Sequence, residues 1–153
     1  MKGVGFTDIN IRKTINGEKN MTRRLKQTFR VGETLFIREV FYLDKRYDDK
    51  TPKQVCLKGD FNVYFEPNEF TGRKRLARFM PEKMARHFIN MVSHRREYLQ
   101  DISYQDAICE GCSDIDEFKS LFISLHGEDI WAKNPIVNVY TYNYGKNDFH
   151  YFV

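Results

Sequence analysis

The sequence lacks the two kinds of apolar segment that would carry it into or across a membrane. No apolar run approaches the ~20 residues that a membrane-spanning helix requires, and the first residues contain no apolar region of a secretory signal peptide. Cysteine is also scarce: there are three, an odd number that does not suit a disulfide framework. Together these absences predict a cytoplasmic protein whose thiols are reduced.

A metal-binding or redox signature is missing as well. Cys109 and Cys112 form a C-x-x-C pair, but a structural zinc site would need a second pair at suitable spacing. Cys56 with His94 or His126 is a poor candidate for that second pair. A redox motif would need a preceding strand within a βαβ unit, and no such pattern is present. Two thiols near a helix end are the better interpretation, so we expect no metal and no cofactor.

Internal repeats and low-complexity segments are absent, and 153 residues are enough for a single core but not for two. The composition is 41% hydrophobic and 15% aromatic, which is typical of a folded, aromatic-rich α+β or β domain rather than a disordered chain. We therefore predict one folded domain over residues 1–153.

Charge is unevenly distributed along the chain. The formal net charge is only +4, but residues 12–30 carry seven basic side chains against one acidic, and residues 71–98 carry eight against two. Residues 99–132 reverse the sign, with eight acidic side chains against one lysine. A fold that brought the two basic stretches together would present a cationic face to phosphate. The alternative is that both stretches are simply solvated faces.

Local patterns predict helices among mostly antiparallel strands. Thr7 or Asp8 can cap a short helix that Gly17 ends, and Ile136 to Tyr144 alternates as the clearest strand. The other expected elements are a strand Thr34–Phe41, a hairpin of Val55–Leu57 and Phe61–Phe65 around Lys58-Gly59-Asp60, a segment Met84–Val92 that fits strand or helix, a short helix ending near Gly111, and a helix from Ser113 or Asp114 to Gly127. This order favours an α+β domain built on a small sheet or partly closed barrel.

Apolar and aromatic side chains indicate which faces are buried. Four residues of the helix before Gly127 keep helical spacing and are expected in the core: Phe118, Leu121, Phe122 and Leu125. Trp131 is most simply a core residue. Three tyrosines share one face of the last strand, where they can stack on bases or pack within the fold, and packing is favoured: Tyr140, Tyr142 and Tyr144.

The least ordinary stretch is Gly17–Arg24, which follows the first helix. Lys19 places an amine three residues before the hydroxyl of Thr22, and Arg23 and Arg24 follow directly. A turn would bring Lys19 and Thr22 to one side, whereas a strand would point them to opposite faces, so a shared site needs a curved loop. A lysine kept neutral by desolvation or neighbouring cations can take the proton of a threonine hydroxyl. The alternative is a loop that only contacts phosphate.

The order of several short motifs resembles the ASCH domain family, which shares the PUA-like barrel fold. The matching pieces run from about residue 6 to residue 144 and are Ile15 through Arg24, Val31-Gly32-Glu33 leading into Leu35 to Glu39, Met80-Pro81 before Ala85-Arg86, Leu99 to Ile102, Asp106-Ala107 before Glu110-Gly111, and Trp131 with Asn134-Pro135. The arrangement looks especially like small ASCH proteins of bacteriophages and prophages. The resemblance implies an α+β fold, a PUA-like small mixed β-barrel with a short N-terminal helix and two short helices before the last strand, and a loop and hairpin insertion at residues 44–78.

The resemblance also implies a site. Family members are regarded as RNA-binding or RNA-processing modules, and a compact bacterial branch resembles amidohydrolases that remove the acetyl group from N4-acetylcytidine. Carried over by position, their lysine, threonine and glutamate match Lys19, Thr22 and Glu110. Asn20 stands where the family commonly has a threonine after the lysine. Nucleic-acid contacts are then expected from four cationic side chains: Arg23, Arg24, Lys26 and Arg38.

Three functions are compatible with these motifs. The first is an ASCH-type module that binds RNA or a modified nucleoside in a basic cleft lined by the Lys19–Arg24 loop, the strand of Arg38 and Glu110. The second is an amidohydrolase that deacetylates N4-acetylcytidine, or a related RNA-directed hydrolase, with catalytic Lys19, Thr22 and Glu110. The third is a phage protein in the cytoplasm of a bacterial host that binds a host protein through the acidic segment Leu99–Ala132.

Overall fold

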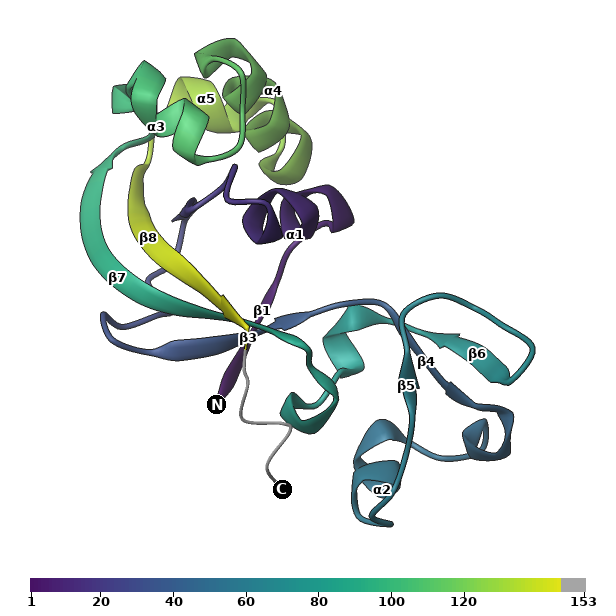
Figure 1. The fold of residues 1–153 in the computed structure, drawn as a ribbon. Helices are drawn as coiled ribbons and strands as arrows, with labels where there is room; N and C mark the ends of the chain where they lie inside the picture. The colour runs from purple at the N-terminus through teal and green to yellow at the C-terminus, as the bar shows by residue number, and fades with distance from the viewer. Residues whose placement is uncertain (147–153) are drawn as a thin grey trace. The chain divides into compact units, whose positions relative to one another are not determined.

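The computed structural model describes residues 1–146 (Figure 1). Its strands are β1 (Lys2–Gly5), β2 (Met21–Arg24), β3 (Thr34–Arg38), β4 (Phe41–Asp44), β5 (Val63–Tyr64), β6 (Thr71–Arg75), β7 (His87–Tyr98) and β8 (Ile136–Lys146). Its α-helices are α1 (Asp8–Ile15), α2 (Pro52–Cys56), α3 (Tyr104–Cys109), α4 (Ile115–His126) and α5 (Asp129–Lys133). Short 3-10 helices are found at Lys45–Tyr47, Ala77–Phe79, Glu82–Met84 and Leu99–Asp101. Across these described residues, every helix is too short or too polar to span a bilayer.

The strands form two sheets. A five-stranded mixed sheet has the order β1-β3-β7-β8-β2, in which β1 runs parallel to β3 and β2 runs antiparallel to β8. A three-stranded antiparallel sheet has the order β5-β4-β6. Helices combined with a mixed sheet and an antiparallel sheet confirm the predicted α+β class.

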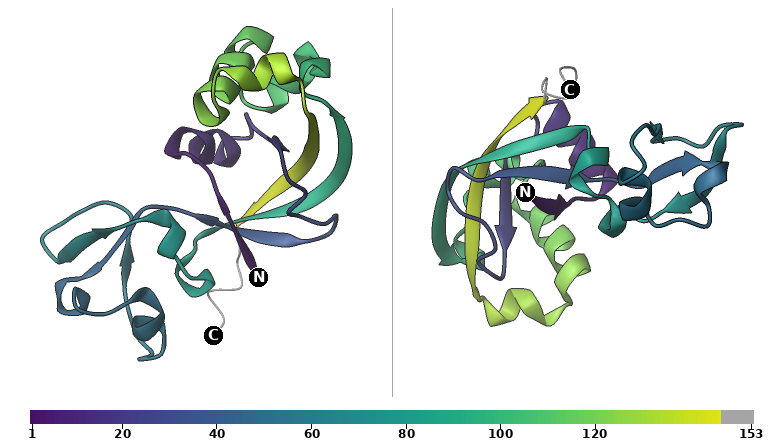
Figure 2. Two further views of the ribbon diagram at one scale, coloured as in Figure 1. Left: turned by 180° about the vertical axis from the view of Figure 1, so that it is seen from behind. Right: turned by 90° about the horizontal axis from the view of Figure 1, so that it is seen from below.

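The chain divides into two compact units. We call Ile9–Thr34 with Ile89–Gly145 the site unit, and Met1–Asp8 with Leu35–Phe88 and Lys146 the insertion unit. Each unit has a hydrophobic core of its own. Figure 2 shows helices α3, α4 and α5 of the site unit, and strands β4, β5 and β6 of the insertion unit, from two further directions.

The core of the site unit joins β2 and β8 to the helices α3 and α4. Its buried members are Met21, Leu99, Ile102, Ala107, Cys112, Phe118, Phe122, Val137 and Val139. As predicted, Phe118 and Phe122 are buried, but Leu121 and Leu125 are 43% and 65% exposed, so their assignment to the core was wrong. Leu121 lies on the flank of the apolar stripe, and Leu125 is the penultimate residue of α4. Helical spacing identifies a face but not how far the opposing surface extends.

Three helices, rather than the predicted two, precede the last strand. The additional one is α5, a single short helix that ends at Asn134 in the left-handed conformation, with φ of 45°. The N–H of Gln100 donates to Asn134 Oδ1 at 2.8 Å, and the Gln100 side chain donates to the Trp131 carbonyl at 2.7 Å. Trp131 is partly buried against the core of the site unit. A five-residue helix offers too few turns for an apolar period to reveal it.

In the insertion unit, the predicted hairpin is replaced by a helix. Thr51 begins α2 with a capping box, in which its hydroxyl accepts from the Gln54 N–H and the Gln54 side chain accepts from the Thr51 N–H. The sequence Thr-Pro-x-Gln is a recognised start signal of this kind, and it outweighs the strand pattern of Val55–Leu57. Strand β5 pairs with β4 instead, through Tyr42 and Tyr64.

In one further segment the structure differs from the prediction, and in another it decides between two predicted alternatives. The expected strand Thr34–Phe41 is interrupted after Arg38, so that β3 and β4 belong to different sheets. The ambiguous segment 84–92 contributes to the long strand β7. The core of the insertion unit collects side chains from both regions: Phe36, Phe41, Leu43, Tyr47, Val55, Met80, Met84, Ala85 and Phe88.

Candidate functional site

The segment between α1 and β2 is held in an extended course by backbone hydrogen bonds. Gly17 ends α1 with a φ of 79°, a conformation that glycine adopts without strain. The N–H of Asn20 donates to the Cys109 carbonyl at 2.9 Å, and the Asn20 carbonyl accepts from the Tyr142 N–H at 2.9 Å. Through these two backbone hydrogen bonds, Asn20 fixes the segment between the end of α3 and β8. Its neighbour Lys19 is buried as a result.

Lys19 forms a buried ion pair with Glu110. Lys19 Nζ lies 2.8 Å from Glu110 Oε2, and it also donates to the Glu110 carbonyl at 2.9 Å and to the Met21 carbonyl at 2.7 Å. Glu110 is in place because it is the C-cap residue of α3. Three acceptors match the three N–H donors of a protonated amine. In this arrangement Lys19 is an ammonium group rather than a free base.

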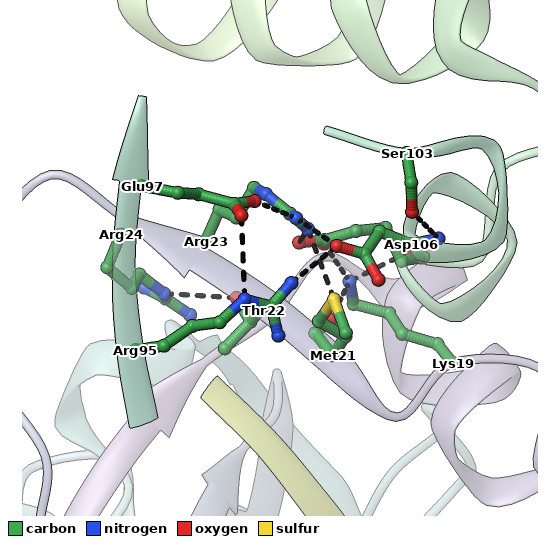
Figure 3. A network of polar contacts seen from close by, with 10 residues as sticks. Lys19, Met21, Thr22, Arg23, Arg24, Arg95, Glu97, Ser103 and Asp106 are labelled. Carbon is green, nitrogen blue, oxygen red and sulfur yellow. Dashed lines mark hydrogen bonds and ion pairs between the residues drawn. The ribbon is translucent and has the colours of Figure 1, made fainter. Parts of the chain in front are cut away.

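Arg23 connects the same glutamate to two further carboxylates (Figure 3). Its Nη1 donates to Glu110 Oε1 at 3.0 Å, and its Nη2 lies 2.6 Å from Glu97 Oε1 and 2.7 Å from Asp106 Oδ2. Arg95 Nη2 approaches Asp106 Oδ2 at 2.5 Å from the other side. We call these six side chains the ion-pair cluster: Lys19, Arg23, Arg95, Glu97, Asp106 and Glu110. With three cations and three carboxylates, the cluster is formally neutral.

Burial and charge act in opposite directions on Arg23. Burial alone would lower the pKa of its guanidinium, but the nearby Glu110 charge and the hydrogen bonds to Glu97, Asp106 and Glu110 raise it above the ordinary value. The Arg23 side chain has 0% exposure. The structure therefore gives Arg23 a different environment from the exposed phosphate contact that we expected, because its donors are directed at carboxylates.

Thr22 lies on strand β2, beside the cluster, and is buried. Its hydroxyl accepts a hydrogen bond from Arg24 Nε at 3.3 Å. The prediction placed Lys19 and Thr22 together on one curved loop. In the structure Lys19 lies in the irregular segment before β2, whereas Thr22 lies within the strand. Burial lowers the pKa of Arg24, and the charge of Glu110 opposes this effect.

The remaining predicted nucleic-acid contacts are divided between the two units. Lys26 is exposed and Arg24 is partly exposed in the site unit. Arg38 belongs to the insertion unit, where its guanidinium carbon lies 5.6 Å from the centroid of the Phe36 ring and its Nε faces Gly3 of β1. Gly3 leaves the room that Arg38 occupies, since a Cβ there would lie 2.3 Å from Arg38 Nε.

Three members of the cluster were missed by the sequence analysis as site residues: Arg95, Glu97 and Asp106. Asp106 was named only as a piece of the motif order, and in the structure Ser103 caps α3 by accepting from the Asp106 N–H at 3.1 Å. The Asp106 carboxylate is free to turn to Arg23 and Arg95 because the cap uses its backbone alone. Arg95 and Glu97 are two apart on a strand and so share a face, which is the one local signal that links them.

The aromatic face of β8 is internal. Tyr140 and Tyr142 are buried, which supports the favoured packing interpretation over base stacking at these two positions. The Tyr140 hydroxyl accepts from the Thr28 N–H at 3.2 Å, and the His94 ring is stacked on Tyr140 at a centroid distance of 4.8 Å. The Tyr142 hydroxyl shares a hydrogen bond of 2.9 Å with Thr14, and burial raises the pKa of Tyr142.

The thiols are not arranged for metal binding in the part of the chain that the structure describes, where no group of three potential ligands occurs. Cys112 is buried in the core of the site unit. Burial, assisted by the negative charges of Glu117 and Glu110, raises the pKa of Cys112 to about 11. Cys112 is therefore an unreactive thiol at neutral pH.

In comparisons with known proteins, no family model, no curated protein and no solved structure matches this chain.

Proposed function

We propose that this protein is an ASCH-type module with a PUA-like barrel that binds RNA or a modified nucleoside beside the ion-pair cluster. The observation that carries the proposal is the contact between Lys19 and Glu110, whose atoms lie 2.8 Å apart although the residues are 91 positions apart in the chain. The ASCH motif order assigns these two residues to one site, and local sequence patterns give no other reason to pair them.

The cluster offers directional groups to a base. Glu97 and Asp106 have partly exposed carboxylates, 19% and 18%, and the Arg95 side chain is 45% exposed. Carboxylates can accept from an exocyclic amine, and a guanidinium can donate to a carbonyl oxygen or stack on a ring. Phosphate contacts in this unit are assigned to Arg24 and Lys26, because Arg23 is buried and both of its Nη groups donate to carboxylates.

Isothermal titration of the full-length protein with N4-acetylcytidine and with cytidine tests this proposal. We expect binding of the modified nucleoside that Asp106→Asn weakens, because the substitution removes an acceptor while preserving the shape of the side chain. Lys133→Gln is the control, since it alters an exposed charge on α5. If neither nucleoside binds, or if Asp106→Asn binds as tightly as wild type, the proposed site is wrong.

The second candidate is the amidohydrolase, and the specific observation in its favour is the buried ion pair of Lys19 with Glu110, two of the three residues that the motif order assigns to the hydrolase. In this mechanism Thr22 Oγ1 attacks the acetyl carbonyl and the bond from that carbon to N4 breaks. The proton of Thr22 moves to the departing amine, and water then releases acetate from the threonine ester. Because Lys19 is held as an ammonium, Glu110 is the group that takes the first proton and Lys19 stabilises the developing negative charge.

Acetate release from N4-acetylcytidine distinguishes the second candidate from simple binding. Wild type is compared with Thr22→Val, Glu110→Gln and Lys133→Gln, each checked for folding by circular dichroism. Catalysis predicts release that the first two substitutions abolish and the third preserves. Nucleoside binding without any release at high protein concentration leaves Lys19, Thr22 and Glu110 as a binding site and excludes the hydrolase.

A further inference from the structure

The insertion unit carries a sheet face that the ion-pair cluster does not use. In β4, Phe41 and Leu43 are buried in the core of the unit, so Tyr42 between them points to the opposite face. Tyr42 is paired with Tyr64 of β5 on one side and with Lys74 of β6 on the other. Residues directly opposite on paired strands project from the same face. Tyr64, Tyr42 and Lys74 therefore form one row across the three-stranded sheet, whose strands are labelled in Figure 1.

The pairing on the other face confirms which side is internal. Leu43 is paired with Val63, and Phe41 is paired with Arg75. Leu43 and Phe41 are core residues and Val63 packs against them. Arg75 is buried because its guanidinium donates to the carbonyls of Tyr47 and Lys50, both at 2.7 Å. The row of tyrosines and lysine is thus the outward side of the sheet.

This outward row combines rings with positive charge. Both tyrosines are partly exposed and Lys74 is exposed. Its neighbour Arg73 is also exposed, and residues 41–79 contain nine basic side chains against six acidic ones. One of those acids, Asp48, is already engaged, since Asp48 Oδ1 accepts from the Arg73 N–H at 2.9 Å. The cations next to the rings are those that a phosphate backbone would meet.

We propose that the row Tyr64–Tyr42–Lys74 is a stacking platform for single-stranded nucleic acid, separate from the ion-pair cluster. Each tyrosine ring contacts the face of one base, and Lys74, which lies in the same row, contacts a phosphate of the strand. Two tyrosines in register on neighbouring strands have Cβ atoms about 5 Å apart, a separation suited to successive bases splayed over a sheet. Stacking of this kind tolerates sequence because every base has a flat face. An unpaired strand fits the row better than a duplex, whose bases are already stacked.

The test uses the full chain and a fluorescein-labelled uridine-rich RNA of about 12 nucleotides, with the same strand annealed into a duplex for comparison. Tyr42→Leu and Tyr64→Leu keep apolar bulk but remove the ring, and Tyr42→Phe and Tyr64→Phe keep the ring. We expect each leucine variant to weaken binding by about five-fold or more, and the phenylalanine variants to bind like wild type. Lys74→Gln should reduce the slope of log affinity against log salt by about 0.7, whereas Lys133→Gln should not.

The outcome also separates this platform from the proposed nucleoside site. Tyr42 and Tyr64 belong to the insertion unit, so their leucine variants should weaken binding of the RNA strand and leave the titration with N4-acetylcytidine unchanged. The platform is refuted if the wild-type protein does not bind the single strand, if the leucine variants bind it as tightly as wild type, or if the duplex binds equally well. Leucine variants that weaken binding of the nucleoside and of the RNA strand alike would tie both to one site and would also refute a separate platform.

Discussion

At the scale of single residues, Arg23 organises the candidate site. Its guanidinium joins three carboxylates from two elements: Glu97 of β7, and Asp106 and Glu110 within and at the end of α3. A guanidinium presents several donors in one plane, so a single arginine can hold all three acids in fixed positions. We therefore interpret Arg23 as a positioning residue that sets the orientation of Glu110 toward Lys19.

The sequence predicted only part of this arrangement. Lys19 and Glu110 were assigned to one site because of the motif order, and the structure brings them into contact. Arg23 was assigned to nucleic-acid contact, whereas in the structure its guanidinium pairs with Glu97, which is 74 positions away in the chain. Pairing at such separation is decided by the fold, and local charge patterns carry no information about it.

Removing the charge of Glu110 should destabilise the protein strongly. Glu110→Gln leaves two buried cations, Lys19 and Arg23, without a carboxylate that both contact. Breaking a buried ion pair in this way typically costs about 3–5 kcal/mol. Arg95→Gln is the control: its side chain is 45% exposed, so its loss should cost less than about 1 kcal/mol. Urea unfolding at neutral pH measures both, and equal losses would contradict the central role of Glu110.

Cys112 should contribute to a loss of stability at alkaline pH. Its pKa rises from an ordinary 9.0 to about 11 in the folded protein. The unfolded chain releases this proton more readily, so the contribution of Cys112 is full below pH 9 and is lost as pH rises through about 11. Urea unfolding between these limits should show a shallower decline in Cys112→Ala than in wild type. Parallel declines would mean that the thiol is not shielded as described.

At the scale of elements, start and stop signals were better predictors than apolar spacing. The cap at Asp114 and the stops at Gly17 and Gly127 were located correctly. The hairpin around Lys58-Gly59-Asp60 was wrong because the capping box at Thr51 was overlooked. The short helix α5 left no periodic signal. Elements of five residues depend on their surroundings more than on their own sequence.

Gly111 should be more sensitive to substitution than Gly127, although each ends a helix with positive φ, 86° and 98° respectively. A Cβ at Gly111 would lie 3.0 Å from Lys13 Cδ and 3.3 Å from Lys19 Cβ, whereas the space around Gly127 is open. Gly127→Ala should therefore cost only the backbone strain, about 1 kcal/mol. Gly111→Ala should cost more, because Lys19 must move as well.

Thermal unfolding followed by circular dichroism compares the two alanine variants directly. A lower midpoint for Gly111→Ala than for Gly127→Ala is the expected result, and the difference between them reports the crowding of Lys19. Identical midpoints would show that Lys19 moves away from the added methyl group without a measurable loss of stability.

At the scale of the whole molecule, the described residues divide into two compact units, and each unit contains a buried hydrophobic cluster. No residue is shared between the two buried clusters of the described chain. Length gives only a prior on the number of cores, since a segment of about 55–65 residues can fold around a small core of its own. The insertion unit does this with Phe41, Tyr47 and Phe88 among its buried members.

Truncating a buried leucine in one cluster should lower the stability of that unit and leave the other unit protected. Leu43 in the insertion unit and Leu99 in the site unit are both fully buried, so truncation of either to alanine should cost about 2–5 kcal/mol. Hydrogen exchange followed by mass spectrometry locates the loss. We expect Leu43→Ala to reduce protection in β4 and α2, and Leu99→Ala to reduce it in α3 and α4, because amide protection follows the local free energy of opening. Equal loss of protection in all four elements from either variant would instead mean that the two cores unfold as one cooperative structure, and that damage to the insertion unit reaches the ion-pair cluster.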